Sequence, residues 1–99
     1  MTGKELTYDY PGPTDWRKHL IPDGIQFRVK TSDGTRRGSA LVIAHADMIR
    51  QKFGDGDPLE VARENSDEIL RRAKELIERP DNRQLNLVCH LYDPKSSKA

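Results

Sequence analysis

The chain lacks most of the features that assign a protein to a class by composition alone. It has one cysteine, Cys89, so no disulfide can form within the chain. Aromatic residues make up only 6% of it, and no apolar run approaches the roughly 18 residues of a membrane-spanning helix. The formal net charge is +1, which argues against an extended nucleic-acid or membrane-binding arm. The N-terminus shows no signal-peptide core, so we expect a cytoplasmic protein without membrane contact.

Apolar residues are also scarce, which predicts a small core. Leu, Ile, Val and Phe account for 21 of the 99 residues, near the level of about a fifth below which disorder is expected. Clear hydrophobic periodicity and the low net charge nevertheless indicate a folded domain. We predict an N-terminal strand and irregular segment packed on the body over residues 1–24, a single domain over 25–91, and a polar, disordered tail over 92–99.

A β-hairpin is predicted in the first half of the domain. Residues 25–30 alternate apolar and polar side chains, as a half-buried strand does. The Asp33-Gly34 pair is a strong hairpin-turn signal, and residues 36–43 form the return strand. The return strand is apolar on both of its sides, which is typical of a strand covered on both faces.

The expected turn decides which residues need that second cover. A two-residue turn pairs Lys30 with Arg37. Leu41 and Ile43 then lie on the side of the hairpin opposite its main apolar face. Either residues 6–21 or a second subunit could cover these two side chains.

Helix signals dominate the middle of the chain. Residues 44–53 predict a short helix that ends at a glycine. Residues 57–79 carry a capping aspartate, a proline at the first helical position, one continuous apolar stripe and a proline after the end. These signals favour one long helix. A second capping-box pattern from Asn65 to Glu68 leaves open a break near Asn65.

The last strand completes the predicted fold. Residues 85–91 alternate three leucines and Cys89 with other side chains, which places this cysteine in the core. We therefore predict an α+β fold in the order strand, strand, strand, helix, helix, strand. A short and a long helix pack on one face of a small, mainly antiparallel sheet.

This arrangement resembles the short bacterial proteins grouped as domain of unknown function 1488. The resemblance covers residues 25–91 and lies in the hairpin, the strand that runs into a short helix over 41–50, and the terminal apolar strand. It includes these positions of the long helix: Asn65, Ile69, Ala73, Leu76 and Ile77. The family implies a fold and no activity.

The pattern predicts no catalytic, metal or cofactor site. Phosphate-binding loops, dinucleotide fingerprints, nucleophile elbows and paired zinc motifs are absent from the sequence. The residues suited to a soft metal or to acid–base chemistry are His19, His45, Asp47, Cys89 and His90. His45 and Asp47 lack the helical spacing that brings two ligands together, and Cys89 and His90 point to opposite faces of a strand. Nothing in the sequence therefore supports an enzyme.

Two surfaces are candidates for binding. The turn gathers a candidate anion patch of four basic residues: Arg28, Lys30, Arg36 and Arg37. A phosphate backbone would relieve the repulsion within this patch, but a solvated hairpin tip or a charged edge that deters aggregation is the favoured explanation.

The second surface is a candidate protein interface that contains aromatic and aliphatic residues: Tyr8, Tyr10, Trp16, Leu41 and Ile43. Aromatic residues often dominate interfaces, and the three aromatics here can equally serve to cover the second face of the sheet. We expect a non-catalytic protein-interaction or self-association module, with a homodimer favoured. The alternative is a regulatory protein that binds anions or nucleic acid weakly through the hairpin.

Overall fold

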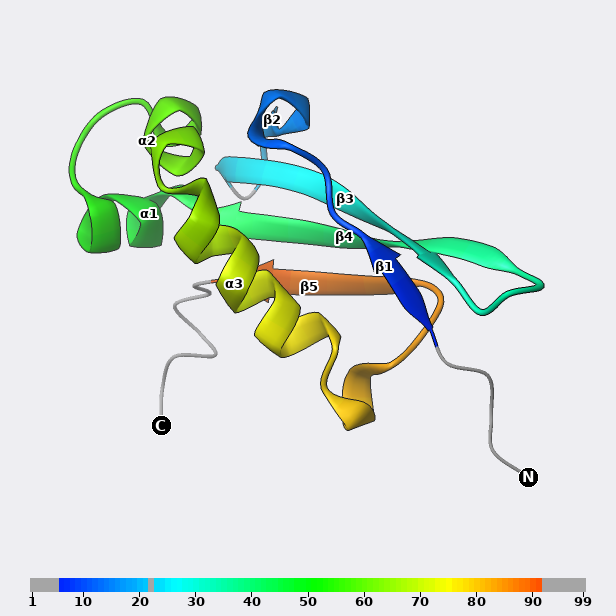
Figure 1. The fold of residues 1–99 in the computed structure, drawn as a ribbon. Coiled ribbons are helices and arrows are strands. Elements are labelled where there is room, and N and C mark those ends of the chain that lie inside the picture. The colour runs from blue at the N-terminus through cyan, green and yellow to red at the C-terminus, as the bar shows by residue number, and fades with distance from the viewer. Residues whose placement is uncertain (1–5, 22, 92–99) are drawn as a thin grey trace.

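The computed structural model describes residues 6–21 and 23–91 of the 99-residue chain, so the predicted tail lies outside the described residues. The strands of the described part are β1 (Thr7–Asp9), β2 (Arg17–His19), β3 (Gly24–Ser32), β4 (Arg37–His45) and β5 (Leu87–Leu91). Its α-helices are α1 (Ala46–Phe53), α2 (Pro58–Glu64) and α3 (Ser66–Ile77), and short 3₁₀ turns occupy Pro13–Asp15 and Pro80–Asn82. The predicted α+β fold is confirmed (Figure 1). None of the described helices has the length and apolar character needed to span a membrane.

Strand β3 is the centre of the sheet. It pairs antiparallel with β4 over its whole length, while β1 and β2 both pair antiparallel with its other edge. Strand β5 lies parallel to β4. The helices α1, α2 and α3 lie between these strands in the chain and return it to the end of the sheet at which β4 begins, so β5 runs in the same direction as β4. The sheet is therefore mixed, with the antiparallel pairs in the majority.

The hairpin register differs from the predicted one by two residues. Lys30 pairs with Ser39, whereas a two-residue turn predicted Arg37. The observed turn lies one residue later, since the Asp33 N–H donates to the Arg36 carbonyl oxygen at 3.1 Å. The Asp33 carboxylate supports this turn by accepting hydrogen bonds from the backbone N–H groups of Thr35 and Arg36, at 2.9 and 2.7 Å. Since side chains alternate along a strand, an even shift leaves every residue on its predicted face.

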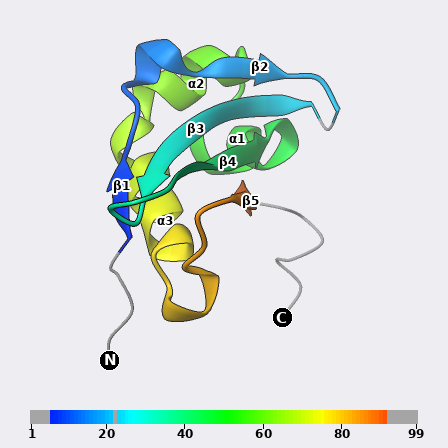
Figure 2. The same cartoon turned by 90° about the vertical axis from the view of Figure 1, so that its right-hand side faces the viewer.

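One face of the sheet, which we call the inner face, carries the core. Helix α3 crosses the strands on this side (Figure 1) and lies to one side of β4 and β5 when the molecule is turned (Figure 2). The buried sheet residues on this face are Ile25, Phe27, Val29, Ala40, Val42, Ala44 and Leu91. The helices bury Ile49, Val61, Ala62, Ile69, Ala73 and Ile77 against them.

The expected long helix is two helices that meet at Asn65. The backbone of Asn65 has φ −113° and ψ 31°, and its side-chain amide donates to the Val61 carbonyl oxygen at 2.8 Å. A side chain that bonds to its own helix in this way competes with regular helical geometry and permits a break. The side chain does not cap α3, so the predicted capping box is not the cause.

The N-terminal segment is held against the inner core. Trp16 is completely buried, and its ring stacks on Phe27 with centroids 4.6 Å apart. The Arg63 guanidinium of α2 donates to the carbonyl oxygens of Pro13 and Trp16, each at 3.0 Å. These contacts attach the segment to the helical side of the sheet.

A second contact attaches the same segment to α3. The Tyr10 hydroxyl donates to the Glu78 carboxylate at 2.6 Å. Residues 6–21 thus extend the edge of the sheet and complete the inner core. Part of the segment also approaches the other face, since Pro11, Asp15 and Arg17 line one cavity together with Leu41.

Candidate functional site

The opposite side of the sheet, which we call the outer face, is the main candidate for a binding surface. The strand registers place these side chains on it: Gln26, Arg28, Lys30, Ser39, Leu41, Ile43, His45, Val88 and His90. Arg28, Lys30, Val88 and His90 are exposed to solvent. In the described part of the chain, the outer face is therefore open at these positions.

Three aliphatic residues form an apolar cluster at the middle of this face: Leu41, Ile43 and Val88. Leu41 pairs directly with Val88 across the β4–β5 boundary, and Ile43 is the next outward residue along β4. Ile43 is only 5% exposed, whereas Val88 is 57% exposed. The sequence pattern missed Val88, since only the parallel β4–β5 pairing brings it beside Leu41.

The aromatic half of the candidate interface does not lie on the outer face. Trp16 is buried in the inner core, so a partner cannot reach it in this fold. Tyr8 pairs with the inward-facing Thr31, and its hydroxyl is buried without a hydrogen-bond partner among the described residues. Burial and the hydrogen bond to Glu78 raise the pKa of Tyr10, so its hydroxyl remains protonated. Of the predicted interface, Leu41 and Ile43 lie on the outer face, where Leu41 is partly exposed and Ile43 is buried.

A pair of histidines lies beside the apolar cluster. His45 ends β4 and precedes α1, and His90 lies on β5 directly beside Ile43. Their ring nitrogens, His45 Nε2 and His90 Nδ1, are 3.1 Å apart, and the ring centroids are separated by 5.3 Å. Spacing along the sequence gave no sign of this pair, because the two residues meet only through the parallel strand pairing.

The other candidate metal ligands are dispersed. Asp47 forms an ion pair with Arg50 on α1 at 3.5 Å. Cys89 faces the inner side and is partly buried, and this burial raises the pKa of its thiol. Among residues 6–21 and 23–91, no three histidine, cysteine or acidic side chains gather in a way that could hold a metal ion.

The predicted anion patch is divided at the hairpin turn. Arg28, Lys30 and Arg37 lie on the outer side of the hairpin, and the Arg28 guanidinium donates to the Ser39 hydroxyl at 3.2 Å. Arg36 instead forms an ion pair with Asp33 at 3.0 Å within the turn. A cavity of about 320 Å³ lies next to Arg28 and Lys30, and Arg17 also lines it.

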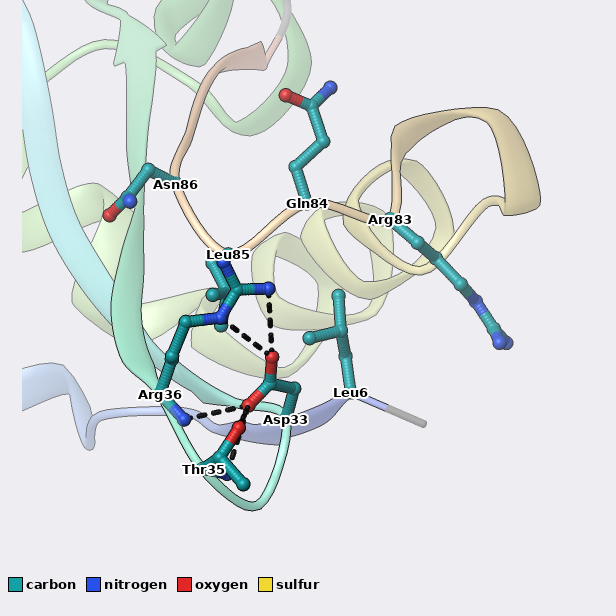
Figure 3. Close-up of a pocket in the computed structure, with 8 residues that line it drawn as sticks. All are labelled: Leu6, Asp33, Thr35, Arg36, Arg83, Gln84, Leu85 and Asn86. Carbon is teal, nitrogen blue, oxygen red and sulfur yellow. Dashed lines mark hydrogen bonds and ion pairs between the residues drawn. The ribbon is translucent and has the colours of Figure 1, made fainter. Parts of the chain in front are cut away.

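A further cavity, of about 690 Å³, lies between the hairpin turn and residues 83–86 (Figure 3). Its charges are already paired or directed elsewhere, since Arg36 binds Asp33 and the Arg83 side chain points away from the turn. Hydrogen bonds from the backbone N–H groups of Arg36 and Thr35 hold the pKa of the Asp33 carboxyl well below its usual range. This arrangement builds a turn and offers no converging groups for catalysis.

No protein-family model, no curated protein and no solved structure matches this chain. The resemblance to domain of unknown function 1488 therefore stays a prediction. We therefore infer function from the outer face.

Proposed function

We propose that the protein functions by self-association, as a homodimer in which two outer faces pack together. The observation that carries this proposal is the apolar cluster on an otherwise open sheet face. Leu41 and Val88 are partly or largely accessible there, while the opposite face of the same strands is already filled by helices. Burying apolar surface of this kind is the usual driving force of association.

The outer face is close in size to what a small dimer interface needs. Strands β3 and β4 span nine residues each, β5 spans five, and β1 and β2 span three each. With a strand spacing of about 4.8 Å and a rise of about 3.3 Å per residue, the face covers about 460 Å² on each copy. The two copies together would bury about 900 Å², close to the roughly 1,000 Å² of a small specific interface.

A twofold axis is also compatible with the distribution of charge. Homodimers are most often twofold symmetric, so the same patch contacts itself. An axis that lies in the interface along the β4–β5 boundary places the two apolar clusters opposite each other. Arg28 and Lys30 belong to β3 and lie to one side of this axis, so the basic groups of the two copies fall on opposite sides of the dimer.

The test is the solution mass of the protein across a dilution series in a buffer that contains EDTA. We expect the mass of two chains at high concentration by light scattering. Val88→Lys and Leu41→Lys should each give a monomer, because a charge would be buried in the interface. Glu64→Lys is the matched control, since it places a lysine on the exposed side of α2.

Two outcomes would contradict the proposal. A wild-type monomer at every concentration would exclude self-association and leave docking on a different protein as the use of this face. A dimer that survives Val88→Lys would show that another surface holds the two copies together.

Weak binding of anions or nucleic acid is the alternative function. The cavity beside Arg28, Lys30 and Arg17 favours it. We place it second because the Arg17 guanidinium already donates to two backbone carbonyl oxygens, at 2.9 and 3.1 Å, and because few basic groups are available to neutralise phosphates. Sub-micromolar binding of an oligonucleotide at about 150 mM salt, lost in Arg28→Ala, would reverse this order.

A further inference from the structure

The two outer-face histidines have the spacing of a metal-chelating pair. Two nitrogens bound to one zinc ion at about 2.0–2.1 Å, with an angle of about 90–110° between them, are about 2.8–3.4 Å apart. His45 Nε2 and His90 Nδ1 are 3.1 Å apart. Both rings retain access to solvent, so an ion can reach them.

The chemistry of the pair suits a borderline metal. Neutral imidazole is a good ligand for Zn²⁺, Ni²⁺ and Cu²⁺. In the hydrogen-bonded pair, one of the two facing nitrogens carries a proton, and that ring must move the proton to its other nitrogen before both can bind one ion. The exchange releases no proton from two neutral rings, and both rings must then turn so that their lone pairs converge on the ion.

The described part of one chain supplies two of the four ligands that zinc prefers. The third histidine, His19, pairs with Gly24 of β3, which in turn pairs with His45. Two strand spacings, about 10 Å, therefore separate His19 from His45 along the sheet. Within residues 6–21 and 23–91, no further histidine, cysteine or acidic side chain completes the site.

A second copy of the chain can supply the other two ligands. We infer that one Zn²⁺ binds between two outer faces, held by His45 and His90 of each copy. This inference rests on the proposed dimer. An axis along the β4–β5 boundary passes over the histidine pair as well as over the apolar cluster, because Ile43 and His90 are register partners. The four imidazoles would then form a closed tetrahedral site of the structural kind.

The experiment measures the metal-free protein first and adds zinc afterwards. With EDTA present, light scattering across a dilution series gives the dissociation constant of the dimer without metal. Titration with Zn²⁺ in a calorimeter should then show one ion per two chains. The dimer dissociation constant should fall at least tenfold in zinc.

Variants identify the ligands. His90→Ala should abolish the effect of zinc on the dimer dissociation constant, judged against the value that the same variant has in EDTA. His45→Ala should do the same, and His90→Asn serves as a second variant of similar polarity. His19→Ala is the matched control and should bind zinc as the wild type does.

Cobalt provides a spectroscopic measurement that does not depend on mass. Co²⁺ in place of Zn²⁺ should give the intense visible absorption of a tetrahedral site, and His90→Ala should lose it. A spectrum typical of six-coordinate Co²⁺ would contradict a site closed by four imidazoles.

The outcomes separate this inference from the proposed dimer. Equal zinc binding by wild type and His90→Ala, with a dimer that persists in EDTA, would overturn the metal site and leave the proposed function intact. One ion per chain without a change in mass would overturn the shared site. A monomer both in EDTA and in zinc would contradict the inference and the proposed function together.

Discussion

The inner and outer faces of the sheet are made by alternate residues of the same strands, yet they differ in almost every contact. On β3, Phe27 is 3% exposed and stacks on Trp16, whereas its neighbours Gln26 and Arg28 face outward. The inner face meets three helices and the N-terminal segment, and the outer face has an apolar cluster, a histidine pair and basic residues at its open positions. This contrast indicates that one face holds the fold together while the other is available for binding. Four predictions test this contrast between the two faces.

The largest expected effect is on the inner face. Trp16→Ala should lower the free energy of unfolding by about 3–5 kcal/mol, because it removes a completely buried ring and leaves a cavity against Phe27. Val88→Ala on the outer face should cost less than about 1 kcal/mol in the monomer. Urea titrations at low protein concentration measure both. Equal losses of unfolding free energy for the two variants would contradict the proposed difference between the faces.

The same contrast should hold across helix α3. Ile69→Ala should cost about 2–5 kcal/mol because Ile69 is completely buried. Leu76 is only partly buried, so Leu76→Ala should cost less than Ile69→Ala. Glu75→Ala should cost well under 1 kcal/mol, although Glu75 pairs with Arg71 and Arg72, because exposed ion pairs are weak. A loss for Glu75→Ala as large as that for Ile69→Ala would mean that the ion pairs, rather than the buried stripe, hold this helix in place.

Adjacent residues on β5 provide a chemical comparison of the two faces. Cys89 is partly buried on the inner side, and desolvation raises the pKa of its thiol. It should react slowly with a thiol reagent near neutral pH and much faster in denaturant. A Cys89→Ser chain that also carries Val88→Cys should react quickly when folded, because residue 88 faces outward. Rapid labelling of the native Cys89 would show that the inner face opens readily.

The smallest expected effect is at the hairpin turn, where the two faces end. The folded-state pKa of Asp33 is depressed by backbone hydrogen bonds, so its contribution to stability is present above the unfolded pKa of about 3.9 and is lost as pH falls below it. Asp33→Asn should therefore be less stable than wild type at pH 6, and the difference should shrink as the pH approaches 3. Denaturant titrations at several pH values measure this difference. A difference that grows toward low pH would contradict the assigned role of the carboxylate.

The alternation of the strands could be predicted because side chains on a strand have a period of two residues. Residues 25–30 and 85–91 placed their apolar side chains on the inner face as expected, and the error in the hairpin register did no harm because it was an even shift. The turn itself could not be predicted from Asp33-Gly34 alone. Hydrogen bonds from the backbone to the Asp33 side chain support a turn one residue later than the one that this pair favours.

The sequence around Asn65 supported two predictions, namely one long helix and a break at this residue. The continuous apolar stripe favoured a single helix, because periodicity depends on neighbours along the chain. The hydrogen bond from the Asn65 side chain to the Val61 carbonyl oxygen competes with regular helical geometry, and the segment forms two helices. With this break, α2 binds the N-terminal segment through Arg63 while α3 crosses the sheet.

The sequence by itself determined which residues alternate, where α2 begins and which side chains need burial, since all three depend on local spacing. Only the tertiary structure decided which residues from distant parts of the chain become neighbours. The parallel β4–β5 pairing joins segments more than forty residues apart, and it places Val88 beside Leu41 and His90 beside Ile43. The outer-face surface and its histidine pair exist because of this one pairing, and pairing between distant strands depends on the whole packed core rather than on any local pattern.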